Sequence, residues 1–208
     1  MLDKITINAH SSIRVGGERV LYFDPFLVTE EPHDADVIFF THSHYDHFSP
    51  KDYAKLAKSD TIFVAPSSMA GDLKKAGIEN AVLLEPNTTM EIAGVPVETV
   101  PAYNIGKLFH PRKNNWLGYV VTVDGQRLYV CGDTDDTPDA RKVKCDVILI
   151  PVGGTYTTTA KEAASLVNYL KPRYAVPTHY GSAVGKSGDG AKFAGLVDDG
   201  ITVVIKIK

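Results

Sequence analysis

Four side chains of types that commonly bind metal ions lie close together in the segment THSHYDH, residues 41–47 of this 208-residue chain. His42 and His44 are two positions apart, so both imidazoles can face one cation from an extended backbone. Asp46 and His47 turn the other way and can serve a second cation. Imidazole and carboxylate together suit zinc, manganese or iron. A polar cap on the following helix explains the segment poorly, because such a cap does not need four residues of this kind.

The neighbouring sequence places this segment at the end of a strand. ADVIFF, residues 35–40, is a continuous apolar run typical of a strand buried on both faces. Ser49 and Pro50 then predict the start of a helix over residues 51–58. Ligands of open α/β sheets commonly bind at the carboxyl ends of strands, which is where this segment would lie.

Two later residues, Asp133 and His179, also end apolar runs. Gly132 precedes Asp133, and a glycine lets the backbone approach a site closely. An aspartate in an ordinary turn and a histidine at an ordinary strand end are the alternatives at these positions.

Strands outnumber helices in the predicted pattern, and a Gly-Gly hairpin is expected at Gly16 and Gly17. Helices are expected at residues 67–76, from the capping box of Thr159 and Glu162 to about Leu170, and near residues 190–197. The last strand is expected over residues 201–208. Strands are expected at residues 4–10, 12–17, 19–26, 35–40, 61–66, 81–86, 89–94, 95–102, 117–123, 126–133, 146–154 and 173–181. The pattern indicates an α/β (α+β) protein in which two mixed sheets pack face to face with helices outside.

The composition is that of an ordinary soluble protein, with 44% hydrophobic and 23% charged residues. A net charge of −3 gives no general attraction to nucleic acid or to anionic membranes. The N-terminus lacks a signal-peptide pattern, and no stretch approaches the ~18 apolar residues of a membrane span. We therefore expect one cytoplasmic domain over residues 1–208. Cys131 and Cys145 are expected to be thiols rather than a disulfide.

The histidine segment resembles the HxHxDH motif of the metallo-β-lactamase fold hydrolases. The resemblance extends over most of the chain: AHSSIRV, FDPF, CGDT and PTHYG match further motifs of a subgroup that includes ascorbate-6-phosphate lactonases and, more distantly, a phospholipase D that cleaves N-acyl phosphatidylethanolamines. The resemblance implies a four-layer αββα sandwich.

The resemblance also implies a set of ligands for one or two divalent metal ions, most readily zinc. His42 and His44 would bind a first metal, while Asp46, His47 and His179 would bind a second. Asp133 would bridge the two. His10 would lie near the centre, either as a group that contacts the substrate or as a support for a ligand. Asp24 is expected to orient a ligand histidine, with a plain strand end as the alternative.

One expected ligand of the first metal does not match. Members of the family usually have a histidine in the loop after the central strand pair, and the equivalent position here is Asn104. His110 lies six positions later. We expect His110 to enter the site from the loop; the alternatives are ligation by the Asn104 amide or a weakened first site, which would leave one metal.

The site predicts a metal-dependent hydrolase that acts on a small-molecule ester or lactone, amide or phosphodiester. Metal-activated hydroxide would be the nucleophile, Asp133 would orient it, and Asp46 would carry a proton to the leaving group. Tyr156 and Tyr180 could donate to an oxyanion, although ordinary packing explains them better. Pro111–Lys113 could contact an anionic group.

Three other functions are compatible with parts of the pattern. A nuclease is disfavoured by the net charge and by the lack of room for a nucleic-acid clamp. A redox di-iron protein is disfavoured because relatives of that kind carry glutamate where this chain has His44, together with a flavin domain. A non-catalytic metal-binding protein is the remaining alternative.

Overall fold

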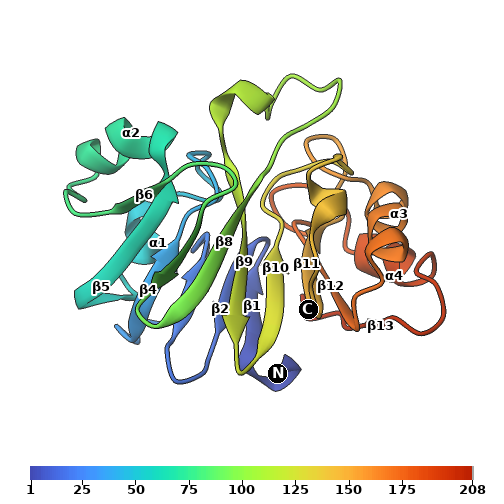
Figure 1. The fold of residues 1–208 in the computed structure, drawn as a ribbon, viewed down its shortest axis with the longest axis horizontal. Coiled ribbons are helices and arrows are strands. Elements are labelled where there is room, and N and C mark those ends of the chain that lie inside the picture. Colours follow the sequence, from blue (N-terminus) through green and yellow to red (C-terminus); the bar gives the residue numbers. More distant parts are fainter. Residues whose placement is uncertain (208) are drawn as a thin grey trace.

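The computed structural model describes residues 1–207, whose strands form two mixed sheets packed face to face (Figure 1). In the first sheet β1, β2 and β3 are antiparallel neighbours, and β3 to β6 run parallel. The strands follow one another in chain order and span Ile5–Ala9, Ser12–Val15, Leu21–Phe23, Ala35–Phe39, Ala57–Pro66 and Val82–Leu84.

The second sheet has the order β13-β12-β11-β10-β9-β8-β7. Its strands β10 to β13 are parallel, whereas β7 to β10 form an antiparallel meander. In chain order from β7 the strands span Thr89–Ile92, Val95–Pro101, Leu117–Val123, Gln126–Val130, Val147–Pro151, Tyr174–Thr178 and Thr202–Val203.

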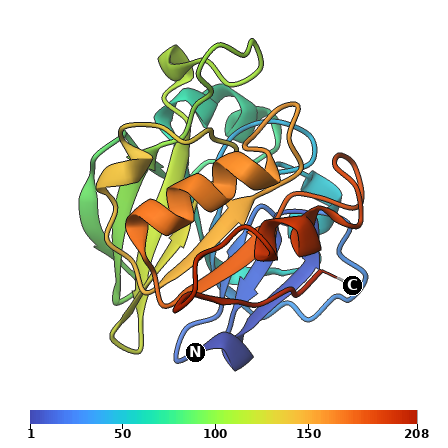
Figure 2. The ribbon, with the colours of Figure 1, turned by 90° about the vertical axis from the view of Figure 1, so that its right-hand side faces the viewer.

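Helices cover the outer faces of both sheets. An apolar cluster joins the first sheet to α1 (Pro50–Tyr53) and α2 (Ala70–Lys75). A second cluster joins the other sheet to α3 (Ala160–Leu170) and α4 (Asp189–Ala194), which lie side by side across its outer face in Figure 2. The predicted four-layer arrangement is therefore confirmed.

The inner faces of the two sheets share one apolar core. Phe23 stacks on Phe39 within the first sheet at a centroid distance of 4.7 Å, and Tyr119 of the second sheet packs 5.0 Å from Phe39. The Tyr119 hydroxyl donates to the carbonyl oxygen of Phe40 at 2.7 Å. The Leu117 amide donates to the carbonyl oxygen of Thr41 at 3.1 Å. These contacts fix the end of β4, where the histidine segment begins, against the second sheet.

After the histidine segment, α1 is shorter than predicted and β5 starts earlier than predicted. α1 ends at Tyr53 rather than at residue 58, because Ala57 already pairs with Ala35 in the sheet. Ser49 precedes the helix as expected, but its hydroxyl donates to the carboxylate of Asp52 and caps no backbone amide.

Three other boundaries differ from the sequence pattern. The predicted helix over residues 67–76 begins as a 3-10 turn, Ser67–Met69, before α2. The hairpin at Gly16 is a loop from residue 16 to residue 20, and neither of its glycines has a positive φ. The last strand is ordered only over Thr202–Val203, and Lys208 lies outside the described residues.

Other expectations hold within residues 1–207. Cys131 and Cys145 are free thiols. None of the helices in this range combines the length and the apolar character that are needed to cross a bilayer.

The capping box at the start of α3 is present as predicted. The Glu162 amide donates to Thr159 Oγ1 at 3.3 Å, and the Thr159 amide donates to Glu162 Oε2 at 2.7 Å. Substitution Thr159→Ala should lower the free energy of unfolding by about 1 kcal/mol, because an amide of the first turn loses its partner. Thr159→Ser is the control and should retain most of the stability. Denaturant midpoints measure both, and equal midpoints for wild type and Thr159→Ala would contradict the assignment.

Candidate metal centre

His10 is placed by a tight hairpin between β1 and β2. Ala9 pairs with Ser12, so His10 is the first residue of a two-residue loop, and its φ is 55°. Residues other than glycine rarely adopt positive φ, and such strain concentrates at functional sites. The imidazole is fully buried.

The histidine segment leaves β4 at Thr41, where Asp24 holds the chain. Asp24 accepts from the Thr41 amide at 2.8 Å, from the Thr41 hydroxyl at 2.7 Å and from His47 Nδ1 at 2.8 Å. Asp24 therefore orients a histidine, as the sequence favoured. Because the Thr41 hydroxyl gives its proton to Asp24, His42 Nδ1 donates to Thr41 Oγ1 at 2.9 Å, which leaves His42 Nε2 as the acceptor nitrogen.

The second sheet brings in three more side chains. Asp133 follows β10 after Gly132, whose φ is 64° and whose Cβ, if it had one, would lie 3.0 Å from the Leu117 carbonyl oxygen. His179 follows β12 with a φ of 56°. His110 lies in the loop between β8 and β9, which protrudes at the top of Figure 1. The close backbone approach predicted for Gly132 is present.

The carboxylate of Asp133 lies at the middle of the cluster and is only 4% exposed. Its Oδ2 lies 3.1 Å from His179 Nε2 and 3.2 Å from His110 Nε2, and its Oδ1 lies 3.3 Å from His47 Nε2. His42 Nε2 lies 3.9 Å from Oδ2. One carboxylate thus faces histidines from both sheets.

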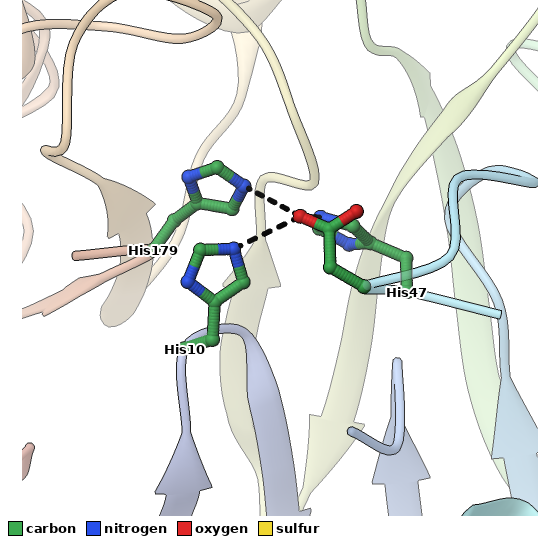
Figure 3. Close-up of side chains that lie close together, drawn as sticks. His10, His47 and His179 are labelled. Carbon is green, nitrogen blue, oxygen red and sulfur yellow. Dashed lines mark hydrogen bonds and ion pairs between the residues drawn. The ribbon is translucent and has the colours of Figure 1, made fainter. Parts of the chain in front are cut away.

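Asp46 occupies the side of the cluster nearest β1. In Figure 3 the rings of His10 and His179 point toward one carboxylate oxygen, Oδ2 of Asp46, at 3.1 Å and 3.7 Å. His47 Nε2 lies 3.7 Å from the same oxygen. Ser182 Oγ lies 3.3 Å from His10 Nδ1, so the ring of His10 is held at both nitrogens.

Among residues 1–207, these side chains form three groups that share members. Within each group, all the ligand atoms lie within 4.8 Å of one another. The groups are His10, Asp46, His47 and His179; His42, His44 and His110; and His42, His47 and Asp133. The structure thus brings together the eight side chains that the sequence proposed as metal ligands or catalytic groups.

Several buried polar atoms of the cluster have no hydrogen-bond partner within the described residues. They are His47 Nε2, His110 Nε2, Asp133 Oδ1 and both ring nitrogens of His179. Buried polar groups are otherwise nearly always paired, and an unpaired one is costly. Among them, the Nε2 atoms of His47, His110 and His179 lie within 3.3 Å of the Asp133 carboxylate, so these nitrogens and Asp133 Oδ1 are suitable ligand atoms for a divalent cation.

The histidines of the cluster differ in the direction in which their pKa values are shifted. Burial and the neighbouring His47 hold the pKa of His42 well below its ordinary value, and burial also lowers the pKa of His10 and of His44. For His47, burial acts in the same direction, but the carboxylates of Asp133 and Asp24 outweigh it and raise the pKa to about 9.

The carboxylates respond to the same charges. Burial would raise the pKa of Asp133, but His179 and His47 hold it well below its ordinary value. Burial likewise opposes ionisation of Asp46, but the hydrogen bond with His10 and the neighbouring imidazole of His179 lower its pKa. Both carboxylates are therefore anionic and suited to a cation.

Asn104 supports His110 rather than facing the cluster itself. Asn104 Nδ2 donates to Asp135 Oδ1 at 3.1 Å, which turns Oδ1 of the amide toward His110 Nδ1 at 2.8 Å. His110 therefore donates through Nδ1 and presents Nε2 to Asp133. Lys107 donates to Asp135 Oδ1 at 2.6 Å and to the Thr157 carbonyl oxygen at 2.7 Å, which joins two loops beside the site.

Three residues beside the centre were not foreseen. Trp116, the only tryptophan, packs against His42, His44 and His110 at centroid distances of 4.8, 4.9 and 5.4 Å. Asp135 and Lys107 complete the support of His110. The position of Asp135, two residues after Asp133 in CGDTDD, was the one available signal for it.

The weaker candidates have other roles in the structure. Tyr180 packs in the apolar cluster under α4, where a Cβ on Gly190 would lie 2.4 Å from its hydroxyl. Arg112 pairs with Asp139 at 3.0 Å. Tyr156 packs edge-on against Phe109 at 4.6 Å.

Comparison with known proteins agrees with this geometry. Residues 3–180 match the model of the β-lactamase superfamily domain. A UPF0173 metal-dependent hydrolase of Pyrococcus abyssi is 33% identical over 97% of this chain and 95% of its own length. A structure from Parabacteroides distasonis, provisionally assigned as a metal-dependent hydrolase, is 32% identical, covers 98% of this chain and 93% of its own, and has a TM-score of 0.82.

A more distant structure shares the fold alone. CmlA of Streptomyces venezuelae, a diiron β-hydroxylase, has a TM-score of 0.82 at 14% identity, and the match covers 98% of this chain but 52% of CmlA. From the matching family model and the relatives above 30% identity, together with the histidine and aspartate cluster, the chain belongs to the β-lactamase superfamily and is a metal-dependent hydrolase.

Proposed function

We propose that the chain hydrolyses an ester or lactone, an amide or a phosphodiester in a small molecule, at a centre of two divalent cations. The observation that carries the proposal is Asp133, a buried carboxylate within 3.3 Å of Nε2 of His47, His110 and His179. His42, His44 and His110 would hold one cation, most readily zinc, and Asp46, His47 and His179 the other. Asp133 would lie between them.

The protein groups would perform the positioning and the proton transfer. A bound divalent cation supplies a lowered pKa for water and a positive charge that stabilises an oxyanion. Asp133 would orient the attacking water through the oxygen that is not engaged with His110 and His179. Asp46, kept anionic by His10 and His179, would accept a proton and pass it to the leaving group. His10 would hold Asp46 in place and contact the substrate beside it.

The electrostatics support a small-molecule substrate in preference to a nucleic acid. The net charge is −3, and Lys107 and Arg112, two of the basic residues near His110, are paired with Asp135 and Asp139. A phosphate backbone is recognised chiefly by lysine and arginine side chains that are available to bind it.

Metal content is the first test of the centre. Elemental analysis should find about two equivalents per chain in the wild type and about one in His110→Ala, because two-cation sites need both sets of ligands. Asp133→Ala should retain less than the wild type and should hydrolyse no member of a panel of esters, lactones, amides and phosphodiesters. One equivalent that is unchanged in His110→Ala would contradict the two-cation centre.

Removal of the metal by a chelator should also change the thermal stability of the protein. A ligand that binds only the folded state stabilises it, so a chelator should lower the melting temperature of the wild type. The same treatment should have little effect on Asp133→Ala. A chelator that shifts both proteins equally would show that its effect lies elsewhere.

The hydrogen bond between Asp24 and His47 can be tested for its effect on metal binding. Asp24→Asn removes the anionic acceptor of His47 Nδ1, so metal affinity should fall by roughly 10- to 100-fold. Asp36→Asn is the matched control, because Asp36 is a partly buried carboxylate of β4 that contacts Lys58 and no residue of the centre. Competition against a metal-binding dye measures both variants. Equal losses of affinity in the two would assign the effect to general destabilisation.

A further inference from the structure

Exposed apolar side chains gather around the candidate centre. Ten large hydrophobic residues are exposed among residues 1–207, and half of them lie in short segments that adjoin site residues. We call these five the apolar rim: Leu27, Tyr45, Ile105, Leu108 and Phe109. Single exposed hydrophobics are ordinary, whereas a group around a concave functional site indicates a binding surface.

One side of the rim is built next to His10 and Asp46. Tyr45, 70% exposed, lies between His44 and Asp46 in the chain, and its ring meets Phe26 at 6.0 Å. The Phe26 ring in turn lies 6.1 Å from that of His10. This side of the rim is therefore continuous with the candidate centre.

The backbone at Leu27 is strained and held in place. Its φ is 52°, which a bulky side chain rarely adopts, and its carbonyl oxygen accepts from Asn8 Nδ2 at 2.7 Å. Backbone strain of this kind is found where function requires it. The strain keeps an apolar side chain at the surface, 46% exposed, next in the chain to Phe26, whose ring lies 6.1 Å from that of His10.

The opposite side of the rim directly precedes His110. Leu108 is 92% exposed and Phe109 is 53% exposed. The loop that carries them is fixed rather than free, because Lys107 bonds to Asp135 and to Thr157, and Phe109 packs on Tyr156. The two sides thus present ordered apolar groups on either side of the same cluster.

Two basic groups beside the rim, Lys107 and Arg112, are already paired. Lys107 pairs with Asp135, and Asp139 accepts from Arg112 and from the Tyr103 hydroxyl. From the apolar rim and these satisfied charges we infer that the substrate is uncharged beside its reacting bond and carries an extended apolar group, such as an alkyl or aryl chain. This inference rests on the proposed function, since the substrate must reach the same centre.

Hydroxamates of different chain length test the inference without turnover, because the hydroxamate group binds metal ions and the chain can lie on the rim. The probes are acetohydroxamate, octanohydroxamate and an eight-carbon hydroxamate that ends in a carboxylate. Trp116 lies against three histidines of the centre and is the only tryptophan, so its fluorescence reports binding to the metal-loaded protein.

We expect octanohydroxamate to bind at least about tenfold more tightly than acetohydroxamate, since burying alkyl surface is favourable. The carboxylate-ended probe should bind more weakly than octanohydroxamate. In Leu108→Ala and Tyr45→Ala the preference for the long chain should fall to about threefold or less. Leu83→Ala, which removes an exposed leucine from β6 at the far edge of the first sheet, should retain the full preference.

Each other outcome overturns the inference. If acetohydroxamate and octanohydroxamate bind equally, or if the carboxylate-ended probe binds most tightly, the substrate class is wrong while the metal centre stands. If Leu108→Ala changes the oligomeric state in light scattering and leaves the chain-length preference intact, the rim is a contact between copies of the chain. If no hydroxamate binds, the proposed centre itself is wrong and this inference fails with it.

Discussion

The burial of the Asp133 carboxylate is the constraint on which the site depends. An ionised carboxylate removed from water is costly unless cations or donors surround it. Here those partners are imidazoles from three separate segments, the end of β4, the β8–β9 loop and the end of β12. The two sheets must therefore pack with these strand ends at the same edge of the sandwich. The aromatic contacts between Phe39 and Tyr119 provide that alignment from within the core.

Two features position the side chains of the centre: strained backbone conformations and hydrogen bonds that orient the imidazole rings. His10, Asp24 and His179 all have positive φ, which the hairpins and sheet edges around them impose. Hydrogen bonds then determine which nitrogen of each ring faces inward: Asp24 engages Nδ1 of His47, and Asn104 engages Nδ1 of His110. These hydrogen bonds hold the two rings in one orientation, which lowers the entropic cost of binding a cation.

The sequence was most informative where a residue type and a strand end coincide. The segment 42–47, Asp133 and His179 each follow an apolar run, so strand periodicity alone could place them at a sheet edge. The position of His110 depends on the path of a loop, and the amide of Asn104 gives no sign of whether it faces a cation or a histidine. The strained turn at Leu27 and the contacts of Trp116 arise from tertiary packing and have no local pattern.

Element ends were less predictable than element types. The helix after the histidine segment stops at Tyr53 because pairing with β4 begins at Ala57, and sheet pairing between distant residues cannot be read from local propensity. The final strand ends at Val203 although the alternating pattern continues. The end of α1 is set by the pairing of Ala57 with β4. The final strand ends where its pairing with β12 ends among the described residues.

The division of the site between the two sheets has a consequence for how the protein acquires its metal. His10 and the histidines of residues 42–47 belong to the first sheet, whereas His110, Asp133 and His179 belong to the second. A ribosome delivers the first sheet well before the second, and domains fold in the order of synthesis only as far as their contacts allow. The early residues alone lack His110, Asp133 and His179, so each group of the cluster is incomplete without the second sheet. With the proposed ligands, selective metal capture would await His179, the last of them in chain order, and would follow the docking of the two sheets.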